Sequence, residues 1–71
     1  MTHTIAAELV GTVLNVVVKE GDVVGAGDTI VVLESMKMEI PVLTEYGGVV
    51  SDLAVREGDT VQEGDVLAVI E

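Results

Sequence analysis

The chain lacks several residue types on which common protein functions depend. Its 71 residues include no Cys, Phe or Trp and a single Tyr. Without Cys there is no disulfide framework, no thiol nucleophile and no thiolate metal site. With almost no aromatic side chains, the core must be built from Val, Ile, Leu, Ala and Met, which favours short strands over helices.

Basic residues are scarce as well. Lys and Arg total 3 against 13 Asp and Glu, which gives a formal net charge of −10 at pH 7. Phosphate binding needs Lys and Arg to displace counterions, so we exclude a nucleic-acid partner. Most acids fall at expected turns and most apolar residues fall between them, so we interpret the charge as a solvated surface.

Long apolar segments are also missing. The longest apolar run, residues 66 to 70, is far shorter than the roughly 20 residues that span a bilayer. No charged segment followed by an apolar one opens the chain, so we predict neither a membrane partner nor a secretory leader. We expect a soluble, cytoplasmic protein in which residues 1–71 form a single small domain.

What the chain does contain is an internal repeat. Residues 11–34 align with residues 48–71 without a gap, at an offset of 37 (48 − 11). Two such halves, related by an approximate two-fold axis, would each bury the apolar face of the other, and one half alone would not fold. The aligned identities are Gly11/Gly48, Val13/Val50, Val18/Val55, Glu20/Glu57, Gly21/Gly58, Asp22/Asp59, Val24/Val61, Gly27/Gly64, Asp28/Asp65, Val32/Val69 and Glu34/Glu71, and Lys19 aligns with Arg56.

Gly and Asp mark turns between short runs of β-branched residues. Gly adopts positive φ without a Cβ clash, and Asp accepts hydrogen bonds from nearby backbone amides in turns. No segment shows the sustained apolar spacing of an amphipathic helix, so we predict an all-β fold made of two similar half-sheets. The strands are expected at residues 4–7, 12–18, 23–24, 29–34, 38–43, 49–55, 60–61 and 66–70.

One cation falls outside the repeat. Lys37 stands between Met36 and Met38 at the seam of the two halves and has no counterpart. Under the two-fold axis its position is equivalent to the place where the chain ends meet, so we expect Lys37 and the termini at opposite ends. Tight hairpins normally use Asn-Gly, Asp-Gly or Gly, and this turn has none, which predicts either a longer loop or local backbone strain.

A lysine at a hairpin tip presents its amine to solvent from a fixed backbone. This suits an amine that another protein must find and modify, whereas a general base would need burial or neighbouring cations. We interpret Met36 and Met38 as a flexible apolar recognition surface beside the amine, the alternative being filler for a core poor in aromatics. The alternative for Lys37 is a surface charge that keeps the hairpin soluble.

The other polar residues predict no catalytic or metal site. The Gly-Asp pairs lack the Asp-x-Asp-x-Asp-Gly spacing of calcium loops, so we assign them to turns. His3 lies in an N-terminal segment without a partner, and Ser35 and Ser51 have no nearby base. No nucleophilic dyad can be assembled from these residues. We therefore predict a chain with no catalytic residue and no metal ligand.

The chain resembles the biotinyl/lipoyl attachment domains, specifically those of the biotin carboxyl carrier type. Met36-Lys37-Met38 matches the central hairpin of that family residue by residue, and Gly11-Thr12-Val13 and the Glu-Gly-Asp turns match its remaining pattern. Ser35 stands where the family usually has Ala, and Leu9-Val10 stands where many members carry Met-Pro. The resemblance is to the minimal, loop-free form. It implies a flattened β-barrel or sandwich of two four-stranded antiparallel sheets with quasi-two-fold symmetry.

The resemblance implies a carrier, not an enzyme. A biotin protein ligase would attach biotin covalently to Lys37, and Met36 and Met38 would flank the site as recognition residues. The tethered biotin would carry carboxylate between a biotin carboxylase and a carboxyltransferase, as subunits or domains of an acyl-CoA or pyruvate-type carboxylase. Two alternatives share the fold: a lipoyl carrier, which usually flanks its lysine with acidic and small residues, and an unmodified interaction or scaffold domain.

Overall fold

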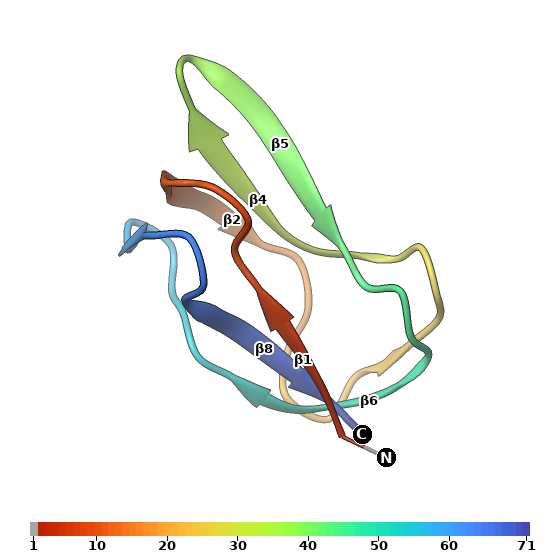
Figure 1. Ribbon diagram of the computed structural model, residues 1–71. Coiled ribbons are helices and arrows are strands. Elements are labelled where there is room, and N and C mark those ends of the chain that lie inside the picture. The colour runs from red at the N-terminus through yellow and green to blue at the C-terminus, as the bar shows by residue number, and fades with distance from the viewer. Residues whose placement is uncertain (1) are drawn as a thin grey trace.

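Short strands account for all the regular secondary structure of the described residues. A computed structural model describes residues 2–71 and contains eight β-strands in that range, with no helix (Figure 1). Met1 lies outside the described residues. The all-β prediction is confirmed. The strands are β1 (His3–Ala6), β2 (Gly11–Val16), β3 (Val23–Val24), β4 (Thr29–Ser35), β5 (Met38–Leu43), β6 (Gly48–Leu53), β7 (Thr60–Val61) and β8 (Val66–Ile70).

The strands form two equivalent four-stranded antiparallel sheets. Their orders are β1-β8-β6-β3 and β5-β4-β2-β7. The repeat maps β1, β2, β3 and β4 onto β5, β6, β7 and β8, and this mapping converts the first order into the second. The two similar sheets that we expected are present, and each takes two strands from each half, so the halves are interleaved. A single half would leave every sheet incomplete.

Hydrogen bonds between the halves follow the same repeat. The Gly21 N–H donates to the Val50 carbonyl at 2.8 Å, and the equivalent Gly58 N–H donates to the Val13 carbonyl, also at 2.8 Å. Each of these two Gly-Asp turns is therefore attached to a strand of the other half. Because these donors and acceptors are backbone groups, the attachment holds whichever side chains lie nearby.

The Gly-Asp turns use the chemistry predicted from the sequence. Gly21 and Gly58 both have φ of 94°, a conformation that side chains disfavour. The carboxylate of each following Asp accepts a hydrogen bond from the backbone amide three residues before it, which closes the turn. These bonds are Lys19 N–H to Asp22 at 2.9 Å, Gly25 N–H to Asp28 at 2.8 Å, Arg56 N–H to Asp59 at 3.0 Å and Gln62 N–H to Asp65 at 2.9 Å.

Two strands end earlier than the β-branched sequence predicts. The strands predicted at 12–18 and 49–55 end at Val16 and Leu53. A bulge precedes each end and increases the local twist, so the chain turns out of the sheet soon afterwards. The register shifts that mark these bulges lie between Val13 and Asn15 in β2 and between Val50 and Asp52 in β6.

The core lies between the sheets, and within residues 2–71 its buried side chains are all aliphatic apart from Thr44. Ile30 and Val31 are adjacent in β4, yet both are fully buried. A register shift between Thr29 and Val31 turns both toward the interior, which accounts for the continuous apolar run there. The Thr44 hydroxyl donates to the Tyr46 carbonyl at 2.8 Å and accepts from the Tyr46 N–H at 3.0 Å, so this buried polar group is satisfied.

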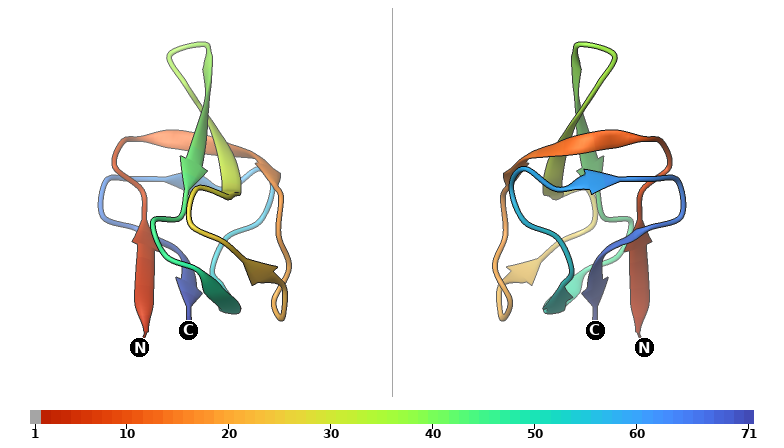
Figure 2. Two further views of the ribbon diagram at one scale, coloured as in Figure 1. Left: turned by 90° about the vertical axis from the view of Figure 1, so that its right-hand side faces the viewer. Right: turned by 90° about the vertical axis from the view of Figure 1, so that its left-hand side faces the viewer.

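The β4–β5 hairpin projects from one end of the molecule, and the chain ends lie at the other (Figure 2). The molecule measures 33 × 18 × 17 Å. His3 pairs with Ile70 in the β1–β8 ladder, which brings the two ends of the chain together. The prediction that Lys37 and the termini occupy opposite ends is confirmed. In the part of the chain that the structure describes, no helix is long and apolar enough to cross a membrane.

His3 makes a structural contact that the sequence did not predict. Its ring stacks on Tyr46, with the ring centroids 3.7 Å apart and the planes at 4°. The two residues are far apart in the sequence, so no local pattern could reveal the contact. Stacking attaches the start of β1 to the loop that precedes β6, and it supplements the pairing of this edge strand with β8.

We predict that Gly48 tolerates no side chain. It has φ of 154°, and an added Cβ would overlap the carbonyl oxygen of Glu71. Gly48→Ala should therefore lower the free energy of unfolding by about 1–3 kcal/mol through strain alone. For a domain of this size, the melting temperature should fall by roughly 4–8 °C for each kcal/mol. Thermal unfolding followed by circular dichroism measures the change.

Gly25→Ala is the matched control. The nearest atom to its added Cβ would be 3.9 Å away, on Asp28. This variant should differ from the wild type by less than about 0.5 kcal/mol. Equal melting temperatures for the two variants would contradict the steric argument.

Candidate functional site

Lys37 occupies the second position of a two-residue turn between β4 and β5. Ser35 pairs with Met38, which leaves only Met36 and Lys37 to reverse the chain. Their φ angles are 53° and 65°. Positive φ at both central residues is what a tight type I′ hairpin requires. Of the two outcomes left open by the sequence, a longer loop or local strain, the structure has the strained tight turn.

The turn holds two residues in a conformation that neither favours. Left-handed backbone costs roughly 1–2 kcal/mol for each residue that carries a Cβ. The paired positions of the β4–β5 ladder extend from Ser35 and Met38 to Thr29 and Leu43, and they hold the turn in place. Met and Lys are therefore not the residues that best form this turn. Two adjacent strained residues make this turn a candidate functional site.

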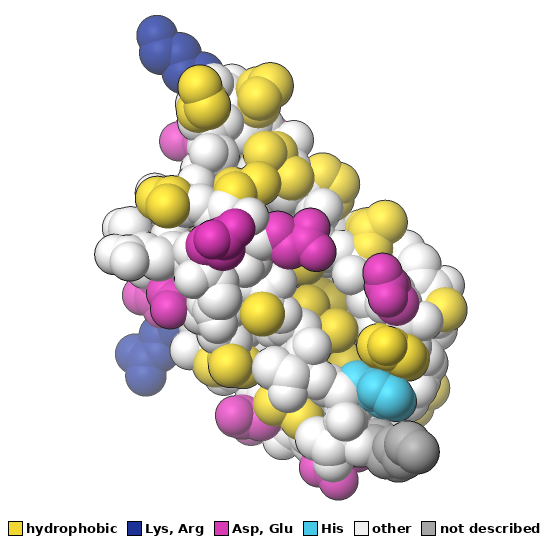
Figure 3. All heavy atoms as spheres, viewed as in Figure 1, with side chains coloured by type: hydrophobic (Ala, Val, Ile, Leu, Met, Phe, Trp, Pro, Cys, Tyr) yellow, Lys and Arg dark blue, Asp and Glu magenta, His cyan; other side chains and the backbone are white. Residues whose placement is uncertain are grey.

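The side chains of the turn are exposed. Met36 is 87% exposed, Met38 is 57% exposed, and Lys37 lies in solvent between them. Neither methionine fills a gap in the core, so that alternative is wrong. In Figure 3 the projecting end carries a basic side chain next to hydrophobic ones, whereas acidic side chains are spread over the rest of the visible face. The tip thus differs in character from the body.

Two carboxylates lie just below the tip. Glu34 in β4 is directly opposite Glu39 in β5, one pair below Ser35 and Met38, and both Glu side chains are exposed. Like charges directly opposite each other destabilise a sheet. The positively charged residue nearest to them in the sequence is Lys37. Acylation of the Lys37 amine would remove this positive charge and leave the tip more acidic.

A shallow groove of about 650 Å³ runs beside the turn. This groove was not predicted from the sequence, because its walls come from segments far apart in the chain. The only signal was the alignment of Val10 with Gly47, which places a branched side chain in one half where the other half has none. The residues that line the groove are Leu9, Val10, Gly11, Thr12, Glu34, Ser35, Met36 and Lys37.

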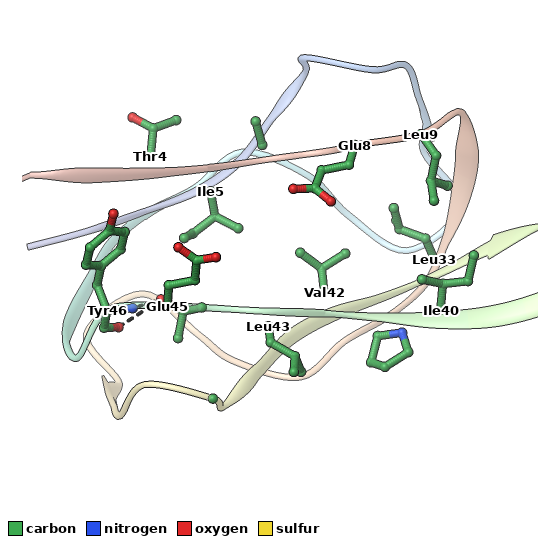
Figure 4. Close-up of a pocket in the computed structure, with 14 residues that line it drawn as sticks. Thr4, Ile5, Glu8, Leu9, Leu33, Ile40, Val42, Leu43, Glu45 and Tyr46 are labelled. Atoms are coloured by element: carbon green, nitrogen blue, oxygen red, sulfur yellow. Dashed lines mark hydrogen bonds between the residues drawn. The ribbon is translucent and has the colours of Figure 1, made fainter.

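A second groove lies between the edge strands β1 and β5, away from the turn (Figure 4). Ile5 and Val42, which the repeat aligns, contribute to its floor, and the side chains of Glu8 and Glu45, also aligned, extend from its opposite walls. The groove therefore straddles the two-fold axis. None of the three residues Met36, Lys37 and Met38 lines it, so it lies outside the candidate site.

The comparison with protein families identifies the class of protein. The profile of the biotin/lipoyl family, described as "Biotin-requiring enzyme", matches residues 2–70 of this chain. The match extends over nearly all of the sequence, including both halves of the repeat and the hairpin between them. The chain therefore belongs to the biotin/lipoyl attachment family.

Two bacterial proteins show which members of the family the chain is similar to. It is 65% identical over 43 residues to the biotinylated protein TB7.3 homolog of Mycolicibacterium smegmatis, and this region makes up 61% of each chain. It is 63% identical over 35 residues to the 1.3S subunit of methylmalonyl-CoA carboxyltransferase from Propionibacterium freudenreichii subsp. shermanii. That region makes up 49% of this chain and 28% of the subunit.

Solved structures have the same fold. The urea carboxylase of Kluyveromyces lactis matches with a TM-score of 0.94 and 34% identity, over all of this chain and 6% of that one. The lipoyl domain of the 2-oxoglutarate dehydrogenase complex from Azotobacter vinelandii matches with a TM-score of 0.74 and 35% identity, over 87% of this chain and 78% of that one. The predicted architecture of two four-stranded antiparallel sheets is confirmed.

We predict that the turn can be made more stable at the expense of the site. The double variant Met36→Asn, Lys37→Gly supplies the pair that type I′ hairpins favour. It should raise the free energy of unfolding by about 1–2 kcal/mol, because the left-handed backbone is no longer penalised. Urea and thermal denaturation both measure this gain.

The control for this variant is Met36→Ala, Lys37→Ala. It removes the same two side chains but keeps a Cβ at both positive-φ positions, so it should bring no comparable gain. If the Ala pair were stabilised as much as the Asn-Gly pair, side-chain removal and not relief of strain would be the cause.

Proposed function

We propose that the chain is a biotin carrier and that a biotin protein ligase attaches biotin to the amine of Lys37. The observation that carries the proposal is an exposed lysine held at the apex of a strained, projecting hairpin between two exposed methionines. Membership of the biotin/lipoyl family supports it. So do relatives whose names record that they are biotinylated.

In this reaction the Lys37 nitrogen attacks the activated carboxyl carbon of biotin. An amide bond forms, the activating group leaves, and the amine gives up a proton to a base that the ligase supplies. The hairpin contributes position, because a fixed backbone spares the ligase the entropic cost of ordering a loop. Met36 and Met38 contribute apolar contact area on either side of the amine.

Once attached, the biotin is the group that carries carboxylate, and the protein carries the biotin. We propose that it moves between the sites of a biotin carboxylase and a carboxyltransferase, each a partner subunit or domain. Tethering raises the effective concentration of biotin at both sites, while the chemistry belongs to the cofactor. The chain itself is not a catalyst in this proposal.

The shape of the domain suits such a shuttle. The hairpin projects from the body, so the amine can enter a partner's active site while the acidic surface stays outside (Figure 2). We propose that residues 1–71 act as one attachment domain and that it works in the cytoplasm, where the ligase and both carboxylase partners would meet it.

We predict that Lys37 alone accepts biotin. Co-expression with a biotin protein ligase and biotin should give a single adduct by intact mass, and Lys37→Arg should abolish it. Arg keeps the positive charge but does not provide the amine that the reaction needs. Lys19→Arg is the matched control, since Lys19 is the other lysine of the chain and is also exposed, and this variant should be modified fully.

The same measurement separates the alternatives. An adduct that appears only with a lipoyl ligase, and has the mass of a lipoyl group, would show that the cofactor is lipoate and not biotin. Absence of any adduct with either ligase would leave an unmodified interaction or scaffold domain.

We predict that the flanking methionines determine the efficiency of the ligase. Met36→Ala and Met38→Ala should each lower kcat/KM for biotinylation by about tenfold, the loss expected for truncating an exposed contact at the centre of an interface. Leu43→Ala is the control, because Leu43 is a similarly exposed apolar residue, 49% exposed, at the far end of β5. An equal loss in the control would indicate a general effect of the hairpin.

A further inference from the structure

The groove beside the turn contains an exposed valine that the fold does not require. Val10 lies just before β2 and is 60% exposed, and it lines the groove together with Met36 and Lys37. Val10 lies one residue before the repeat, and the same offset of 37 places it opposite Gly47, which has no side chain. The fold therefore tolerates Gly at the position that corresponds to Val10. The valine occurs only on the side of the molecule where the groove includes Lys37.

The walls of the groove combine apolar and polar groups. Leu9, Val10 and Met36 provide aliphatic surface, and Thr12 and Glu34 provide a hydroxyl and a carboxylate. Thr12 and Glu34 are directly opposite each other in the β2–β4 register, so their side chains leave the same face of the sheet. An apolar surface with a few polar groups on one side is the usual composition of a small-molecule site.

The group proposed for Lys37 matches this composition. Biotin has an aliphatic chain and a bicyclic head whose ureido group offers one carbonyl acceptor and two N–H donors. The chain and the ring edges can lie against Val10 and Leu9. The Thr12 hydroxyl can donate to the ureido carbonyl, and the Glu34 carboxylate can accept from an ureido N–H. The carbonyl and one N–H of the head therefore each have a partner of the opposite kind, and the second N–H faces solvent.

The tether begins at the groove itself. Because Lys37 is one of the lining residues, the biotinyl group needs only to fold back along the hairpin to enter. We propose that the biotinyl group on Lys37 rests in this groove against Val10 when no partner holds it. This inference rests on the proposed function. The groove is shallow, so the group leaves it readily, and tethering favours its return.

The test compares methyl NMR spectra of the unmodified and the biotinylated protein, after intact mass has confirmed a single adduct. The methyl resonances of Val10 and Leu9 should shift on biotinylation, and Val10 should show nuclear Overhauser contacts to the biotin ring. The methyl resonances of Val23, which lies on β3 of the other sheet and is 81% exposed, should stay unchanged.

Two variants make the test specific. Val10→Gly introduces the residue that the same offset of 37 places opposite Val10, and it should abolish the shift of Leu9 on biotinylation. Val23→Thr likewise introduces the residue of the second half, Thr60, and should leave the shift of Leu9 intact. Equal melting temperatures of the unmodified variants would show that both have kept the fold.

The outcomes distinguish this inference from the function on which it rests. A biotin adduct whose spectral changes are confined to residues 36–38, or that persist unaltered in Val10→Gly, would overturn the resting site and leave the carrier function standing. Absence of an adduct on Lys37 would overturn the carrier function and, with it, the occupant of the groove.

Discussion

The exchange of backbone hydrogen bonds between the two halves is the constraint on which the rest of the structure depends. The Val50 carbonyl accepts from Gly21 at 2.8 Å, and the Val50 N–H donates to Asp22 at 2.9 Å, so a turn of the first half brackets a strand of the second. In the same way, the turn of the second half forms the two equivalent backbone hydrogen bonds with the carbonyl and the N–H of Val13. This interleaving lets a chain without aromatic core residues form a defined structure, because neither half can move without breaking bonds to the other.

The projecting hairpin that the site needs also exposes a sheet edge. β5 is an edge strand, and an open edge invites pairing with another chain. Pro41, the only proline of the chain, lies within this strand, where it has no N–H to offer an incoming strand. The exposed charge of Glu39 opposes such pairing further. The hairpin can therefore hold Lys37 in solvent while β5 resists association with other strands.

Local signals predicted most of the fold, and contacts between distant segments account for what was missed. The β-branched runs, with Gly and Asp at most of the turns between them, located all eight strands, and the unmatched Lys37 between Met36 and Met38 indicated the candidate site. The early strand ends depend on bulges, and the stacking of His3 on Tyr46 depends on tertiary contact. The conformation of the turn stayed open, because neither Met nor Lys indicates positive φ. The groove at Val10 required the three-dimensional structure.

The repeat also separates what the fold requires from what it merely permits. Gly11 and Gly48 occur at equivalent positions. At each of them, an added Cβ would overlap a backbone carbonyl oxygen of the segment that pairs with its strand. The fold therefore requires glycine at both positions. Lys37 and Val10 have no such equivalents: both fall outside residues 11–34 and 48–71, and the same offset of 37 places Gly47 opposite Val10. A residue that the fold needs should appear in both halves. Exposed residues that appear in one half only, next to a turn that stores strain, are therefore those for which function is the better explanation.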